Sequence, residues 1–144
     1  MSNIEDSTGI TRRGALCALS LVGVGIFSSP EAATAATGVK ILPSGKVQVT
    51  LKSNPALRKV GGVVRIDDVQ GKSIALVRTS AKAYTAINLL CTHLGGELVQ
   101  TGNQWQCEEH QATFTLAGKN LVGPATTALK RLPVRATASM VTIG

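Results

Sequence analysis

Short stretches of alternating apolar and polar residues dominate the chain beyond residue 40 and predict β-strands. Polar segments at 67–72 and 80–83 are expected to form turns, and 117–120 is expected to close a hairpin. Beyond residue 40 no segment keeps the 3.6-residue period of a helix, so the sequence predicts an all-β fold. The expected strands are 47–51, 63–66, 74–77, 85–89, 132–135 and 140–143.

The first 36 residues have a different pattern and are interpreted as a twin-arginine signal peptide or an N-terminal membrane anchor. Residues 11–16 read TRRGAL, which resembles a twin-arginine export motif, and an apolar stretch follows from 14 to 29. That stretch is 16 residues long, whereas a bilayer-spanning helix needs about 20 apolar residues. The small residues Ala33 and Ala35 form a cleavage signal. A cleaved signal is therefore favoured over an anchor, and both remain open.

The remaining chain is interpreted as a linker and first strand at 37–55, followed by one domain at 56–144. The whole chain carries 15 Lys and Arg against 8 Asp and Glu, a net charge of +7. Its basic residues are scattered rather than clustered, and aromatic residues make up only 3%. A nucleic-acid partner is therefore excluded, because single-strand binding depends on aromatic stacking surfaces and basic grooves.

Two Cys–His pairs carry the candidate chemistry of this chain. Cys91 and His93 are spaced C-x-H, and Cys107 and His110 are spaced C-x₂-H, with 13 residues between the pairs. They include the only two histidines, and the one remaining cysteine, Cys17, lies in the N-terminal apolar stretch. Two thiols and two imidazoles can hold a [2Fe–2S] cluster or a zinc ion. Structural zinc sites usually space their cysteines C-x₂₋₄-C, so zinc is the distant alternative.

The motifs CTHLG at 91–95 and CEEH at 107–110, with their flanking segments over about residues 56–143, resemble the Rieske iron–sulfur family. The resemblance implies an antiparallel β-sandwich base with a small two-loop cluster-binding subdomain. It also implies one [2Fe–2S] cluster per chain, with Cys91 and Cys107 on one iron and His93 and His110 on the other.

The resemblance further implies one-electron transfer, with no independent catalytic site on this chain. The expected role is an exported redox carrier or the iron–sulfur subunit of a respiratory-type oxidoreductase. The alternative is the Rieske subunit of a quinol-oxidising cytochrome bc-type complex. The expected location is the periplasm or the outer face of the cytoplasmic membrane. The partner would be a cytochrome or a larger oxidoreductase subunit, or quinol, and a basic face is hypothesised to dock an acidic partner or an anionic membrane.

The chain departs from the family pattern around the predicted ligands. Gly96 and Glu109 stand where many quinol-oxidising members carry a disulfide. Ala112 stands where the family usually has serine, and Phe114 where high-potential members have tyrosine. Both changes remove hydroxyl groups that would hydrogen-bond to sulfur and stabilise the reduced cluster.

We therefore expect a reduction potential in the lower part of the Rieske range, roughly −150 to +100 mV. The negative charges of Glu108 and Glu109 beside the second loop act in the same direction. A redox titration followed by electron paramagnetic resonance measures the midpoint. A value well above this range would contradict the argument from the missing hydroxyl groups.

Overall fold

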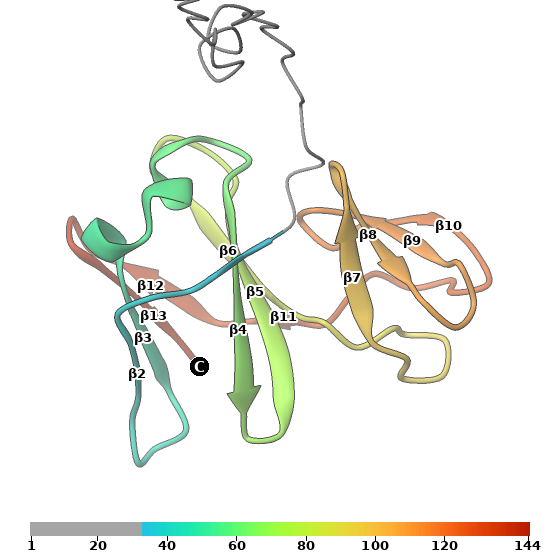
Figure 1. The fold of residues 1–144 in the computed structure, drawn as a ribbon, viewed down its shortest axis with the longest axis horizontal. Coiled ribbons are helices and arrows are strands. Elements are labelled where there is room, and N and C mark those ends of the chain that lie inside the picture. Colours follow the sequence, from blue (N-terminus) through green and yellow to red (C-terminus); the bar gives the residue numbers. More distant parts are fainter. Residues whose placement is uncertain (1–32) are drawn as a thin grey trace, which may run out of the picture.

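The computed structural model describes residues 33–144, which form three packed β-sheets (Figure 1). The first half contains β1 (Thr34–Ala35), β2 (Val39–Ile41), β3 (Val47–Thr50), η1 (Leu51–Ser53), η2 (Pro55–Arg58), β4 (Val63–Val69), β5 (Lys72–Arg78) and β6 (Tyr84–Asn88). The second half contains β7 (Leu98–Thr101), β8 (Gln104–Cys107), β9 (Thr113–Thr115), β10 (Asn120–Val122), β11 (Arg131–Leu132), β12 (Val134–Ala136) and β13 (Met140–Ile143).

The three sheets form layers, with one sheet between the other two. The central sheet has the order β1-β4-β5-β6-β11, and only the β1–β4 pair is parallel. The base sheet, β12-β13-β3-β2, packs on one face of the central sheet. The ligand sheet, β10-β9-β8-β7, packs on the other face. The predicted all-β class with a base and a smaller appended unit is confirmed.

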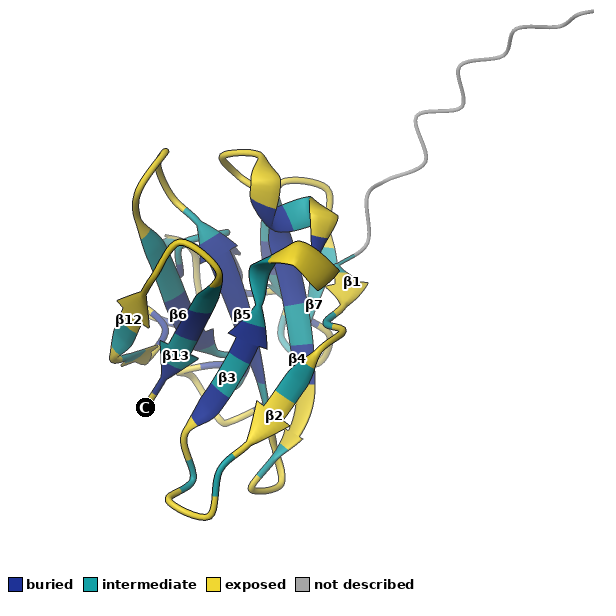
Figure 2. Cartoon of the chain, turned by 90° about the vertical axis from the view of Figure 1, so that its left-hand side faces the viewer, coloured by how far each residue is buried: buried dark blue, intermediate teal, exposed yellow. Residues whose placement is uncertain are grey.

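Strand β5 lies in the middle of the central sheet and contributes to a core on each side. Ala75 and Val77 face the ligand sheet, whereas Ile74 and Leu76 face the base sheet, as expected from the two-residue period of a strand. All four are buried, which explains why this segment is a continuous apolar run instead of an alternating one. Figure 2 shows buried residues concentrated on the strands, while the connecting loops are exposed.

The first core lies between the central sheet and the ligand sheet. Its members are Val63, Ala75, Val77, Ile87, Leu89, Cys91, Leu98, Trp105, Cys107, Ala112, Phe114, Ala125 and Leu129. The second core, between the central and base sheets, consists of Val47, Val49, Leu57, Val64, Ile66, Ile74, Leu76, Ala86, Val141 and Ile143. The two ligand cysteines predicted from the sequence therefore belong to the first core.

Several strand boundaries differ from those expected. Strands β4 and β5 extend into the predicted turn at 67–72, because Gln70 and Gly71 make a tight reversal with φ angles of 54° and 72°. The expected strand at 132–135 is divided into β11 and β12 around Pro133, which has no N–H for a ladder hydrogen bond. Strand β2 and strands β7 and β8, which flank the turn at Gly102, are not among the strands expected from the sequence.

The fold includes Thr34, Ala35 and Ala36, although the sequence predicts that residues 1–36 are a signal peptide or an anchor outside the folded domain. Thr34 and Ala35 pair with β4, and the Ala36 N–H donates to the Arg65 carbonyl at 2.8 Å. Ala33 packs against the first core and Ala36 against the second. The physical reason is that β1 satisfies backbone groups on the edge of β4. The export motif at 11–16 and Cys17 lie outside the described residues.

Within residues 33–144 no helix is long and apolar enough to cross a bilayer.

A buried asparagine ties the N-terminal segment to the base of the molecule. Asn54 is 3% exposed. Its Oδ1 accepts from the Thr37 N–H at 2.9 Å, and its Nδ2 donates to the carbonyls of Thr37 and Thr50 at 2.7 and 2.8 Å. All the hydrogen-bonding groups of this side chain thus serve to hold two segments together.

We expect Asn54→Ala to lower the free energy of unfolding by about 1–3 kcal/mol, because it leaves part-buried backbone groups without partners. Urea unfolding followed by circular dichroism measures the change. Asn103→Ala, at an exposed turn position, is the control and should shift the free energy by less than about 0.5 kcal/mol. Equal effects of the two substitutions would show that the Asn54 hydrogen bonds do not stabilise the fold.

Candidate metal centre

The two predicted ligand loops have the same backbone hydrogen-bonding pattern. In the first loop, the Cys91 N–H donates to the Gly96 carbonyl at 2.7 Å, and the Gly95 N–H donates to the Cys91 carbonyl at 2.9 Å. In the second loop, the Cys107 N–H donates to the carbonyl of residue 112 at 2.8 Å, and the Gln111 N–H donates to the Cys107 carbonyl at 3.0 Å. Each loop therefore reverses the chain directly after its cysteine.

The reversal requires a positive φ angle four residues after each cysteine. Gly95 has a φ of 79°, which glycine adopts at no steric cost, and Gln111 has a φ of 60°. Leu90 and Glu97 form a bridge that closes the first loop, while the second loop connects β8 to β9. The sequence spacing C-x-H against C-x₂-H conceals this likeness, because the histidines stand at different positions in equivalent loops.

Both cysteines are buried and neither forms a disulfide. Cys91 is 3% exposed and Cys107 is 0% exposed. Burial raises the pKa of the Cys91 thiol, and the neighbouring Cys107 thiol raises it further, despite backbone hydrogen bonds that act in the opposite direction. In the absence of a bound metal group the raised pKa keeps the Cys91 thiol protonated at neutral pH, so a metal group that binds here must displace that proton.

Glycine at position 96 leaves space beside the Cys107 thiol. A Cβ atom on Gly96 would lie 3.0 Å from Cys107 Sγ and 3.2 Å from Glu109 Oε2, closer than nearly all real Cβ contacts. The first loop can therefore approach the second loop closely only where it has no side chain. This position is where the sequence analysis noted the absence of a disulfide cysteine.

The two histidine rings meet edge to face and lie nearer the surface than the thiols. The ring centroids of His93 and His110 are 4.7 Å apart, with an interplanar angle of 81°. His93 is exposed, and the side chain of His110 is 30% exposed. His110 Nδ1 lies 4.0 Å from Cys107 Sγ and 3.9 Å from Glu109 Oε2. All four residues predicted from the sequence are thus brought to the ends of two adjacent loops.

The donor atoms are arranged as buried sulfur and exposed nitrogen. Within residues 33–144, no three or more His, Cys, Asp or Glu side chains are already close enough together to hold a single metal ion. A structural zinc ion takes four ligands at a single point. A [2Fe–2S] group takes two protein ligands on each of two irons, with the histidines on one iron. Two buried thiols and two imidazoles nearer the surface fit the ligand set of the two-iron group, which takes the two donor types on different irons.

A third segment supports the first loop. The Thr92 hydroxyl donates to the Thr127 carbonyl at 2.8 Å, and Asn120 Nδ2 donates to the Ala125 carbonyl at 2.8 Å. Ala125 is itself part of the first core. The segment at 123–127 therefore lies against the first ligand loop.

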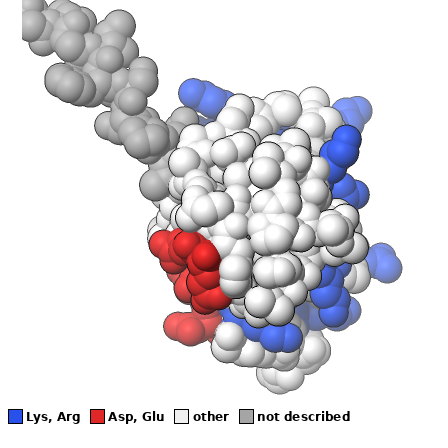
Figure 3. All heavy atoms as spheres, turned by 90° about the vertical axis from the view of Figure 1, so that its right-hand side faces the viewer, with Lys and Arg blue, Asp and Glu red and all other residues white. Residues whose placement is uncertain are grey.

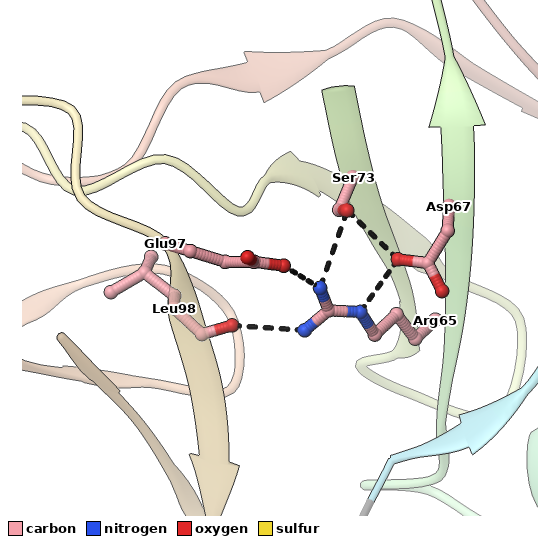
Figure 4. A network of polar contacts seen from close by, with 5 residues as sticks. All are labelled: Arg65, Asp67, Ser73, Glu97 and Leu98. Carbon is pink, nitrogen blue, oxygen red and sulfur yellow. Dashed lines mark hydrogen bonds and ion pairs between the residues drawn. The ribbon is translucent and has the colours of Figure 1, made fainter. Parts of the chain in front are cut away.

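Arg65 connects the central sheet to the first ligand loop, and the sequence analysis did not identify it. Figure 4 shows its guanidinium group between the carboxylates of Asp67 and Glu97. It donates to Asp67 at 2.7 Å, to the Leu98 carbonyl at 3.0 Å and to the Ser73 hydroxyl at 3.3 Å. The only sequence signal was an arginine inside an apolar strand.

The network favours the charged forms of Arg65 and Asp67. Burial opposes the charge on Arg65, but hydrogen bonds and ion pairs with Asp67 and Glu97 outweigh it, so the pKa of Arg65 lies above its usual value. Hydrogen bonds from Arg65 and Ser73 lower the pKa of Asp67. At neutral pH Arg65 and Asp67 are therefore ionised and paired. Arg65 holds the residues that follow the first ligand loop against β4.

Comparison with known proteins gives one family. The family model for the Rieske [2Fe-2S] domain matches residues 50–133, which is more than half of the chain. No curated protein sequence matches. The matched range, residues 50–133, includes all four predicted ligand residues.

Two solved structures illustrate the shared fold. The chain is similar to the cyanobacterial plasma membrane Rieske protein from Synechocystis PCC 6803, with 23% identity and a TM-score of 0.51, over 60% of this chain and 90% of that chain. It is also similar to the quaternary ammonium Rieske monooxygenase CntA in complex with L-carnitine, with 22% identity and a TM-score of 0.52. That match covers 63% of this chain but only 30% of the monooxygenase.

We expect Arg65→Met to lower the free energy of unfolding by about 1–3 kcal/mol and to reduce the iron content per chain. The substitution removes the ion-pair partner of Glu97 and the side-chain donor to the Leu98 carbonyl, and it leaves Asp67 with Ser73 as its remaining partner. Arg65→Lys should have a smaller effect, because it keeps the charge but loses the planar donor geometry.

Urea unfolding and iron analysis of the purified protein at pH 7 measure both effects. Lys82→Met, at an exposed position between β5 and β6, is the matched control and should change neither. If Arg65→Met keeps wild-type stability and iron content, the network has no role in holding the first loop.

Proposed function

The chain belongs to the family of Rieske [2Fe-2S] domains, which bind a [2Fe–2S] cluster and transfer electrons through it. From this membership we propose which residues of the chain hold the cluster. Cys91 and Cys107 bind one iron, and His93 and His110 bind the other. The separation of the two donor types carries the proposal, because both thiols lie in the first core while the two imidazoles meet at the surface.

When bound, the cluster supplies a one-electron couple whose potential is raised by neutral imidazole ligands. The residues of this chain control its surroundings. The first core excludes water from the side of the thiols, whereas His93 is exposed and can be reached by solvent or by a partner. His110 Nδ1 faces Cys107 Sγ, so we assign Nδ1 as the ligand atom and Nε2 as the nitrogen that holds or releases a proton.

We propose that the protein works as an exported one-electron carrier or as the iron–sulfur subunit of a respiratory-type oxidoreductase. The twin-arginine motif at 11–16 supports export, because that route accepts a folded protein that already contains its cofactor. The partner is then a cytochrome or a larger oxidoreductase subunit. The activity of the similar monooxygenase is not proposed, because the chain spans only 30% of that protein.

Quinol oxidation in a cytochrome bc-type complex is the alternative role, and it would be accompanied by a retained N-terminal membrane anchor. The pairing of Thr34 and Ala35 with β4 supports retention of at least these residues in the mature protein. N-terminal sequencing of the exported protein distinguishes the two roles. A mature chain that begins after residue 35 would exclude the anchor.

Replacing each cysteine in turn tests the ligand assignment. We expect Cys91→Ser and Cys107→Ser to lose the cluster, because a serine hydroxyl at a buried position is a much poorer iron ligand than a thiolate. Cys17→Ser, the matched control in the N-terminal apolar stretch, should retain two irons and two sulfides per chain, as the wild type does.

Iron and sulfide analysis gives the first measurement, and electron paramagnetic resonance of the reduced protein gives the second. The wild type and Cys17→Ser should give a rhombic signal with couplings from two nitrogen nuclei. A colourless wild-type protein containing zinc, or a full cluster in Cys107→Ser, would overturn the assignment.

A further inference from the structure

Acidic residues are confined to one part of the described molecule. Residues 33–144 contain five of them, Asp67, Asp68, Glu97, Glu108 and Glu109, against 13 Lys and Arg. We call these five residues the acidic patch. Figure 3 shows Asp and Glu side chains gathered at one side of the face drawn, whereas Lys and Arg are spread over other parts of it.

The acidic patch adjoins the ligand loops. The backbone of Glu97 forms a β-bridge with Leu90 that closes the first loop, and the Glu108 N–H donates to the Glu97 carbonyl at 3.5 Å. Glu109 Oε2 lies 3.9 Å from His110 Nδ1 in the second loop. Arg65 links Glu97 to Asp67, so the patch continues from the loops to the β4–β5 hairpin.

Cations within the patch do not cancel its charge. Arg65 is the only Lys or Arg that forms an ion pair among the described residues, and it offsets one of the five negative charges. The ligand loops and the strands around them, residues 83–118, contain three Glu and no Lys or Arg. The side chains of Asp67, Glu97 and Glu109 are 53%, 55% and 63% exposed. The surface beside the ligands is therefore negative although the protein as a whole is positive.

An exposed apolar side chain lies at the end of the first loop. Leu94 follows His93 and is 71% exposed, the highest value among the exposed large hydrophobic residues of the described chain. Protein interfaces commonly combine an apolar centre with a polar rim. Leu94 and the acidic patch provide these two parts next to the exposed histidine.

We propose that Leu94 and the acidic patch form the docking surface for a redox protein whose own docking face is positively charged. The proposal rests on the function proposed above, because electrons must pass close to the histidines. At physiological ionic strength the screening length is about 8 Å, so charges within the interface outweigh those elsewhere on the molecule. This is the opposite of the acidic partner that the net charge of +7 suggests.

The donor is the cluster-loaded protein, reduced beforehand with dithionite and separated from excess reductant, and the acceptor is an oxidised cationic c-type cytochrome. Stopped-flow absorbance follows cytochrome reduction as ionic strength rises from roughly 10 to 200 mM. Both proteins carry net positive charge, so docking at random positions would make the rate rise with salt. We expect the rate to fall at least about threefold instead, because the acidic patch attracts the cytochrome.

Two variants with the same change in net charge locate the effect. Glu108→Gln with Glu109→Gln removes two negative charges from the patch. Ala136→Lys with Ala138→Lys adds two positive charges at exposed positions in and after β12, in the base sheet. We expect the first variant to lose most of the salt dependence and the second to keep it. The substitutions can also change the reduction potential of the cluster and hence the rate at every salt concentration. The comparison therefore uses the slope of the logarithm of the rate against ionic strength, which such a constant change does not alter.

The outcomes separate this inference from the proposed function. A rate that rises with salt in the wild type, or equal slopes in the two variants, would overturn the acidic docking surface while leaving the electron-transfer role intact. Absence of a reducible cluster, detected by electron paramagnetic resonance before mixing, would instead overturn the proposed function. A wild-type rate that falls with salt, together with a loss of slope only in the Glu variant, supports the docking surface.

Discussion

The burial of Cys91 and Cys107 in the first core is the constraint on which the rest of the structure depends. Both cysteines pack with Trp105 and Phe114, so the contacts that hold the ligand sheet on the central sheet also place the two sulfur atoms. The backbone then reverses in the same way after each cysteine. Because of these reversals the histidines reach the surface while the thiols stay inside, and a metal group bound there would be dry on one side and accessible on the other.

The central sheet separates the supporting part of the molecule from the part that carries the chemistry. Its two faces are covered by different sheets, and alternate residues of β5 enter different cores. Arg65 is a polar connection between the central sheet and the ligand loops, and its ion pairs link β4 to the residues just after the first loop. Changes in the base sheet should therefore affect overall stability, whereas changes around Arg65 should also affect the geometry of the metal centre.

The net positive charge of the chain does not describe the surface around the predicted ligands. A net charge of +7 favours acidic partners when the molecule is viewed from a distance. Close to the ligands, however, the glutamates at 97, 108 and 109 outnumber the one cation paired there, Arg65, and residues 83–118 contain no lysine or arginine. The same carboxylates stand near the predicted cluster ligands, where negative charge disfavours reduction. The same group of residues is thus expected to lower the potential and is proposed to select the partner.

The sequence by itself determined the all-β class, the family and the four candidate ligands. Alternating apolar positions give the class, and two Cys–His pairs in a chain with no other histidine leave few choices for a metal centre. It did not reveal β1, β7 or β8, the division at Pro133, or the role of Arg65. Short strands and long-range ion pairs have weak local signals, because their stability comes from partners distant in the chain. Only the tertiary structure brought the two loops together, buried the thiols and gathered the acidic residues beside them, since each of these depends on contacts between residues far apart in sequence.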